Sequence, residues 1–130
     1  MNIKDNFTGV QHIGMPTNNL NATMDFYKKI GFDTALRTYN ETAKEEVAFM
    51  RLGDFTLEIF ESGKAPLTAG AIDHIAINVK SIDVAYKYIC ENGLNNTNDE
   101  IHFLPFWDNG VKYFTIEGPS KERIEFSQYL

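Results

Sequence analysis

Several features that define particular protein classes are scarce in this sequence. The 130 residues include one cysteine, Cys90, so an intrachain disulfide is impossible. No apolar run approaches the ~20 residues of a membrane-spanning helix, and the first residues lack the apolar stretch of a signal peptide. Acidic residues outnumber basic ones by 18 to 12, which argues against nucleic acids and anionic membranes as partners. We therefore expect a cytoplasmic protein that binds neither nucleic acids nor membranes.

The composition is that of a folded domain. Hydrophobic residues make up 43% of the chain and aromatic residues 13%, which is enough for a packed core and excludes a disordered chain. A length of 130 residues suits one domain, or two very small modules.

The chain repeats itself with an offset of 62 residues, measured between His12 and His74. Each histidine lies in a short apolar segment. A helix-capping residue follows it by seven positions and a glycine by nineteen: Asn19 and Gly31 in the first half, Ser81 and Gly93 in the second. Apolar residues between these marks recur at helical spacing, which predicts one amphipathic helix in each half. Cys90 lies on the apolar side of the second helix, so we expect it to be buried.

Around the two helices the apolar pattern changes to the alternation of strands. We expect strands near residues 10–15, 34–39, 46–52, 55–60, 72–77, 101–106, 111–117 and 123–129. The pair Asn109-Gly110 predicts a hairpin between the sixth and seventh strands. Each half is thus a βαβββ module. The predicted organisation is one domain over residues 1–130, with modules at about 8–61 and 71–129 and a linker at 62–70.

Two histidines and two glutamates stand out within these strands, because each points away from a row of apolar neighbours. The first module supplies His12 and Glu58, and the second supplies His74 and Glu125. A lone strand histidine or glutamate is usually a surface or core residue, but here both types recur in both repeats. Imidazole nitrogens and carboxylate oxygens together suit a divalent transition metal.

Longer motifs carry a family resemblance over about residues 8–129. They are His-Ile-Gly-Met at 12–15, Asp-Phe-Tyr at 25–27 with Gly-Phe at 31–32, Asp-His-Ile-Ala at 73–76, and Glu-Gly-Pro at 117–119 leading into Ile-Glu-Phe at 124–126. The chain resembles the vicinal oxygen chelate superfamily of glyoxalases, bleomycin-resistance proteins and dioxygenases. The resemblance implies an α+β fold of two βαβββ modules that form an incomplete β-barrel.

Within that superfamily the chain is most similar to glyoxalase I, lactoylglutathione lyase. The resemblance implies metal ligands at His12, Glu58, His74 and Glu125, with one nickel, zinc or cobalt ion per site. It implies a lyase or isomerase that converts a 2-oxoaldehyde–thiol adduct, or a similar small carbonyl compound, by proton transfer through a metal-bound enediolate. Glu125 is the expected catalytic base, and Glu58 is its counterpart.

The residues at the positions where family members bind the thiol cofactor differ from the family pattern. Where glutathione-dependent members place charged or amide donors, this chain has Pro16, Ser62 and Gly70. An anionic tripeptide needs fixed donors, so these positions argue against glutathione as the small thiol.

Three further residues are candidates for substrate binding: Phe60, Trp107 and Arg37. The aromatic pair could wall an apolar pocket, although Trp107 could equally pack within its loop. Arg37 could meet an anionic substrate, and its alternative is an ion pair at the surface.

Other functions stay open at this point. They are a metal-dependent thiol transferase of the antibiotic-resistance type, a non-catalytic small-molecule binding protein, and an oxygen-dependent ring-cleaving enzyme. Because modules of this kind leave open sheet edges, we expect a C2 homodimer. The metal site could be built within one chain or across that dimer.

Overall fold

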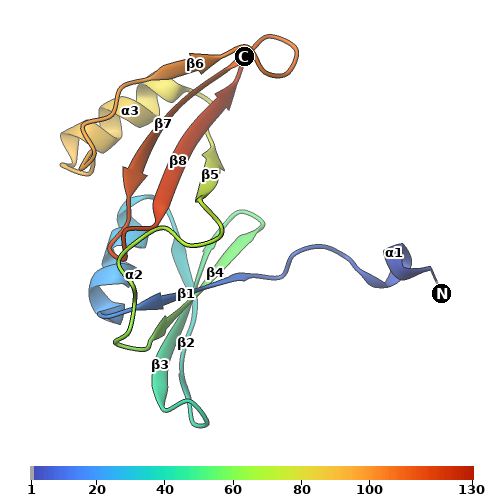
Figure 1. Ribbon diagram of the computed structural model, residues 1–130, viewed down its shortest axis with the longest axis vertical. Helices are drawn as coiled ribbons and strands as arrows, with labels where there is room; N and C mark the ends of the chain where they lie inside the picture. Colours follow the sequence, from blue (N-terminus) through green and yellow to red (C-terminus); the bar gives the residue numbers. More distant parts are fainter. Residues whose placement is uncertain (1) are drawn as a thin grey trace. The chain divides into compact units, whose positions relative to one another are not determined.

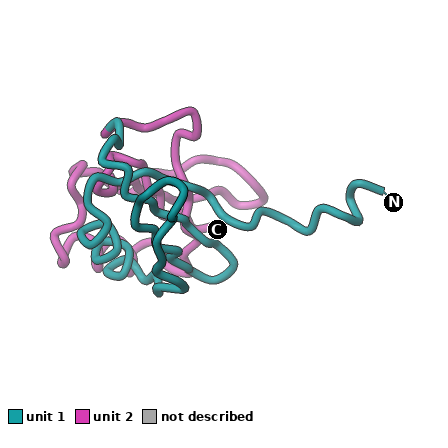
Figure 2. Tube along the Cα trace, turned by 90° about the horizontal axis from the view of Figure 1, so that it is seen from below, with its two compact units in different colours: residues 1–66 teal, residues 67–130 magenta. Residues whose placement is uncertain are grey.

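A computed structural model describes residues 2–130 and divides the chain into two compact units (Figure 2). The first unit ends at Pro66 and the second begins at Leu67. Each contains a four-stranded mixed sheet and one long helix, which establishes the α+β fold of two modules (Figure 1). Within residues 2–130, no helix is long and apolar enough to cross a bilayer.

The first unit follows the predicted βαβββ order after a short extra helix, α1 (Ile3–Asn6). Its elements are β1 (Ile13–Thr17), α2 (Leu20–Lys29), β2 (Asp33–Asn40), β3 (Glu45–Leu52) and β4 (Phe55–Glu61). The strands lie in the order β1-β4-β3-β2. β1 and β4 are parallel, and the other neighbours are antiparallel.

The second unit repeats this topology. Its elements are β5 (His74–Asn78), α3 (Ile82–Glu91), β6 (His102–Leu104), β7 (Val111–Glu117) and β8 (Arg123–Tyr129). The strand order is β5-β8-β7-β6, again with the first and last strands of the module parallel.

Each helix covers one face of its own sheet: α2 packs on β2, β3 and β4, and α3 packs on β7 and β8. The predicted apolar stripe of α2 is buried. The strand side chains that face the helices are buried too. Leu57 and Ile59 in β4 are at most 1% exposed, and Ile124 in β8 is fully buried. Glu58 and Glu125 alternate with these residues, so both carboxylates lie on the open faces of the sheets.

Both helices begin at the predicted capping residues. The Asn19 side chain accepts a hydrogen bond from the backbone N–H of Ala22 at 3.0 Å, and Ser81 accepts one from Val84 at 3.2 Å. These bonds satisfy N–H groups that have no partner inside the helix.

A second contact ties each helix to the last strand of its module. The Glu61 carboxylate accepts the N–H of Leu20 at 2.8 Å, and the Gln128 side chain accepts the N–H of Ile82 at 2.8 Å. Glu61 and Gln128 lie three positions after Glu58 and Glu125, respectively. The repeat therefore extends to the contacts that position the site strands.

The structure corrects some boundaries. β1 begins at Ile13 and β5 at His74, so His12 directly precedes its strand. The helix α1 was not expected, and Cys90, expected on the buried stripe of α3, is exposed.

β6 is shorter than predicted because side chains of the preceding loop occupy the edge of β7. Asp99 accepts the N–H of Thr115 at 2.8 Å, and Asn96 bonds both backbone groups of Glu117, at 3.0 and 2.8 Å. These contacts take the hydrogen-bonding groups that a longer β6 would have used.

Candidate active site

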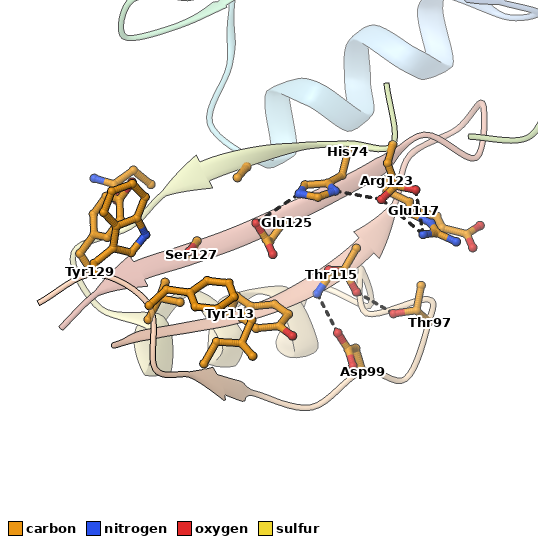
Figure 3. A pocket seen from close by; sticks show the side chains of 17 residues that line it. His74, Thr97, Asp99, Tyr113, Thr115, Glu117, Arg123, Glu125, Ser127 and Tyr129 are labelled. Atoms are coloured by element: carbon orange, nitrogen blue, oxygen red, sulfur yellow. Dashed lines mark hydrogen bonds and ion pairs between the residues drawn. The ribbon is translucent and has the colours of Figure 1, made fainter. Parts of the chain in front are cut away.

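In the second unit, strand pairing brings a predicted histidine and glutamate together. β5 and β8 pair in parallel with Ala76 opposite Glu125, and His74 lies two residues earlier on the same face. The imidazole Nε2 of His74 lies 3.7 Å from Oε2 of Glu125 (Figure 3). Both side chains reach solvent, with 45% and 19% of their surfaces exposed. One nitrogen and one oxygen donor thus converge on an accessible point.

The residue before this histidine orients its ring. Nδ1 of His74 lies 2.9 Å from the Asp73 carboxylate, which Arg123 contacts at 3.1 Å. A proton on Nδ1 directed at Asp73 leaves the Nε2 lone pair available to a metal. The hydrogen bond from His74, aided by the charge of Arg123, lowers the pKa of Asp73 below its usual value. The carboxylate therefore stays ionised as the acceptor.

The first unit holds the matching half-site. Gly14 lies opposite Glu58 in the β1–β4 pair, and a Cβ at Gly14 would lie 3.6 Å from Oε1 of Glu58. Nδ1 of His12 lies 2.9 Å from the side-chain oxygen of Gln11. Phe49, directly opposite Glu58 in β3, contacts the His12 ring edge-on at 5.6 Å between centroids. His12 and Glu58 thus border one face, and Nε2 of His12 is again the available nitrogen.

The orienting residues Gln11 and Asp73 were not predicted as functional. The sequence does carry a signal, because each immediately precedes its module's histidine and each has a side-chain oxygen. Hydrogen bonds of this kind hold metal-binding imidazoles in one orientation. With such a hydrogen bond in both units, the imidazole and carboxylate donors have the chemistry that a divalent metal ion would require.

Each unit supplies two of the four predicted ligands. Over residues 2–130, no group of three or more His, Cys, Asp or Glu side chains lies close enough together to hold a metal ion. A complete four-ligand site therefore remains a prediction that requires the two half-sites to meet.

The open face of the second sheet carries a cavity of about 760 Å³ that includes His74 and Glu125 (Figure 3). Its floor is formed by alternate residues of β5, β7 and β8, and its remaining wall by the segments 97–99 and 104–107. The size lies within the range of small-molecule sites.

The three predicted substrate-binding residues have different surroundings. Trp107 lines the cavity and contacts Tyr129 edge-on at 5.5 Å. Phe60 lies on the Glu58 face of the first unit, because its ring would be 3.7 Å from a Cβ at Gly14.

Arg37 is not brought to either half-site. It pairs with Ala48 in β3, on the helix-covered face, and contacts Asn21 at 2.8 Å and Glu46 at 3.9 Å. This geometry is the surface pairing that was the alternative for Arg37.

Comparison with known proteins agrees with this architecture. The model of the Glyoxalase/Bleomycin resistance protein/Dioxygenase superfamily matches residues 9–126. The chain belongs to this superfamily. It is 31% identical over 124 residues to an uncharacterized protein of Bacillus subtilis, YwbC, with 92% of this chain and 96% of the relative covered.

Crystal structures of superfamily proteins share the fold. A glyoxalase family protein from Enterococcus faecalis superposes with a TM-score of 0.72 at 22% identity, covering 93% of this chain and 98% of the other. The fosfomycin resistance protein FosX from Listeria monocytogenes, determined with Mn(II) and sulfate, gives 0.71 at 17% identity, covering 95% and 94%. At these identities the likeness extends to the fold alone.

Proposed function

We propose that this superfamily member is a metal-dependent lyase or isomerase of the glyoxalase I type. Its substrate is a 2-oxoaldehyde–thiol adduct or a similar small carbonyl compound with two neighbouring oxygens. His12, Glu58, His74 and Glu125 hold one divalent metal ion, and Glu125 moves the proton. The thiol is a small one, and glutathione is disfavoured.

One observation carries the proposal: the duplicated register of histidine and glutamate. In both units the glutamate lies opposite a small residue two positions after the histidine, Gly14 or Ala76. In both units Nδ1 of the histidine contacts the preceding side chain at 2.9 Å. A surface histidine needs no such orientation, whereas a metal ligand does.

The chemistry follows from the donor set. A divalent metal at these residues would polarise the substrate's oxygens and stabilise negative charge that develops on them. Glu125 lies on the cavity floor beside His74 and can accept a carbon-bound proton from a substrate in that cavity. Thr115 lies directly opposite Glu125 in β7 and lines the same cavity. Glu58 has the corresponding position in the first unit.

The proposal includes a C2 homodimer in the cytoplasm. In such a dimer His12 and Glu58 of one chain would face His74 and Glu125 of the second, or each chain would build its own site. Mixing a His12→Ala chain with a His74→Ala chain separates the two assemblies. Only a site shared across the dimer regains metal binding in the mixture.

The first test is the metal content of untagged protein, measured by inductively coupled plasma mass spectrometry. We expect about one nickel, cobalt or zinc ion per chain, and loss of that ion in His74→Ala. His102→Ala is a matched control, because His102 is also exposed in the second unit but bonds Asp99 at 2.6 Å. No metal after reconstitution would refute the proposal and favour a non-catalytic binding protein.

Turnover then distinguishes the reactions. Loaded protein that converts 2-oxoaldehyde–thiol adducts, and loses this activity in Glu125→Gln, supports the proton-transfer reaction. The second candidate is a thiol transferase that opens an epoxide antibiotic. It would use the same metal with three ligands, so the presence of a fourth predicted ligand, Glu58, argues against it. Consumption of fosfomycin with a thiol, and not of the adducts, would select it.

A further inference from the structure

The cavity of the second unit is larger than the smallest carbonyl substrates require. A volume of about 760 Å³ lies in the upper part of the range of roughly 300–1,000 Å³ that small-molecule sites span. A three-carbon oxoaldehyde would fill a small part of it. The cavity therefore has room for a ligand with a second part beyond the oxygen-bearing group.

The floor of the cavity changes from charged to aromatic along β8. Arg123, Glu125, Ser127 and Tyr129 all line it, since alternate strand residues share a face. At ~3.4 Å per residue, Tyr129 lies on the order of 13 Å along the strand from Glu125. In Figure 3, Tyr129 and the pair His74 and Arg123 accordingly lie at opposite ends of the floor.

The neighbouring strand repeats this gradient. Glu117 pairs with Arg123 at the charged end, and Val111 pairs with Tyr129 at the other end. Between them Tyr113 pairs with Ser127. The order is therefore a property of the whole floor and not of one strand.

At the apolar end, Trp107 is held in an unusual conformation. Its φ is +65°, in the left-handed region that bulky residues rarely adopt. The indole lines the cavity and contacts Tyr129 at 5.5 Å, yet 73% of Trp107 and 60% of Tyr129 remain exposed. A ligand that covered these two rings would gain apolar and aromatic contact area.

Charge at the site argues against an anionic ligand. Among the described residues that line the cavity, Arg123 is the sole permanent cation, and it already contacts Asp73 at 3.1 Å. Glu117 and Glu125 on the floor and Asp99 on the wall add further carboxylates to the lining. An anionic tail would meet no unpaired cation there.

We propose that the substrate is an elongated, uncharged compound whose vicinal oxygens lie at His74 and Glu125 and whose aromatic tail covers Trp107 and Tyr129. The oxygen-bearing end rests on the proposed function, whereas the aromatic end rests on the cavity itself. Trp107 is then the residue that selects for the tail.

The test uses three α-hydroxy ketones that share one head group: hydroxyacetone, 2-hydroxy-4′-phenylacetophenone, and the same biphenyl ketone with a carboxylate on its outer ring. Trp107 is the one tryptophan of the chain, so its fluorescence reports directly on the apolar end. Calorimetry gives affinities for variants that lack it. We expect the neutral biphenyl ketone to bind at least tenfold more tightly than either other compound, and to shift the tryptophan emission to the blue.

Trp107→Ala should remove this advantage, so that the biphenyl ketone binds no more tightly than hydroxyacetone does to the same variant. Tyr39→Ala is the matched control, because Tyr39 is an exposed aromatic of the first unit, outside the cavity. Equal affinity of all three ketones, or an advantage that survives Trp107→Ala, would overturn the inference.

Failure of the proposed function looks different. If the protein bound no metal but the biphenyl ketone still bound through Trp107, the tail site would stand and the lyase proposal would fall. If metal bound and hydroxyacetone occupied the site while the biphenyl tail gave no gain, the lyase proposal would stand and the tail site would fall.

Discussion

The two units share a topology and a pair of ligand types, but the open faces of their sheets are filled differently. The residue opposite the glutamate is Phe49 in the first unit and Thr115 in the second. Two positions after the glutamate, Phe60 in the first unit corresponds to Ser127 in the second. The cavity lies over the small residues of the second sheet, whereas in the first sheet Phe49 contacts His12 and Phe60 lies beside Gly14.

This difference indicates a division of labour between the repeats. Both can offer one imidazole and one carboxylate, but the second unit also provides the space in which a ligand would lie. The first unit would then contribute mainly to holding the metal. The first three of the following experiments change equivalent positions in the two units and compare the responses, and the last changes a residue of the second unit alone.

The largest expected effect is on turnover, from Glu125→Gln. Glu125 lines the cavity, whereas Glu58 lies opposite Phe49. Glu125→Gln should therefore lower kcat about 10²–10⁴-fold, which is the usual contribution of a general base. Glu58→Gln should reduce kcat less and act mainly through metal content. The measurement is kcat on 2-oxoaldehyde–thiol adducts with bound metal quantified in each sample. Equal losses at matched metal content would show that the units do not differ in this way.

Metal affinity should respond to the orienting residues that precede the histidines. Replacing such a partner of a metal-binding imidazole typically lowers affinity ~10–100-fold. Asp73→Ala should lie at the upper end of this range, because its carboxylate is charged, and Gln11→Ala at the lower end. Competition with a chromogenic chelator gives both constants. Asp54→Ala, an exposed turn residue, is the control, and affinities unchanged in both variants would remove the orienting role.

Much of this arrangement could be predicted from the sequence because it depends on local rules. Asn19 and Ser81 carry the capping chemistry, and alternation around Glu58 and Glu125 determines which side chains face the helices. Both predictions are confirmed.

The rest depends on contacts between distant segments. The short β6 follows from Asp99 reaching Thr115 across 16 residues, and the left-handed φ of Trp107 occurs in a turn. Neither feature leaves a periodic pattern. The positions of Asp73 and Gln11 indicate an orienting role only once the histidine that follows each of them is known to need a hydrogen-bond partner at Nδ1.

Stability should change by smaller amounts at the contacts that tie each helix to its sheet. Glu61→Ala leaves the N–H of Leu20 without its acceptor, and Gln128→Ala does the same to Ile82. A charged acceptor at a helix N-terminus is worth more than a neutral one, so we expect losses of about 2 and about 1 kcal/mol, respectively. Urea unfolding measures both, with exposed Glu41→Ala as a control near zero. A larger loss of stability in Gln128→Ala than in Glu61→Ala would contradict the expectation that the charged acceptor stabilises its helix more.

The smallest effect concerns Asp99, which no residue of the first unit matches in the contacts described. Partial burial opposes its ionisation, but hydrogen bonds from His102 and from the N–H groups of Thr115 and Glu100 outweigh burial and lower its pKa. A carboxyl whose pKa is lower in the folded chain stabilises the fold above its unfolded pKa of about 4. That contribution disappears as the pH falls through the folded value.

The wild type should therefore exceed Asp99→Ala in stability by about 1 kcal/mol from pH 7 to pH 5. The difference should narrow below about pH 4, where the carboxyl becomes protonated in the unfolded chain, and should be lost as the pH falls through the lower pKa of the folded chain. Urea midpoints of the two proteins across this pH range test the expectation. Because Asp99 protects the edge of β7 beside the cavity, the variant should also open the amide of Thr115 to hydrogen exchange. An unchanged exchange rate would mean that the β7 edge is protected without this carboxylate.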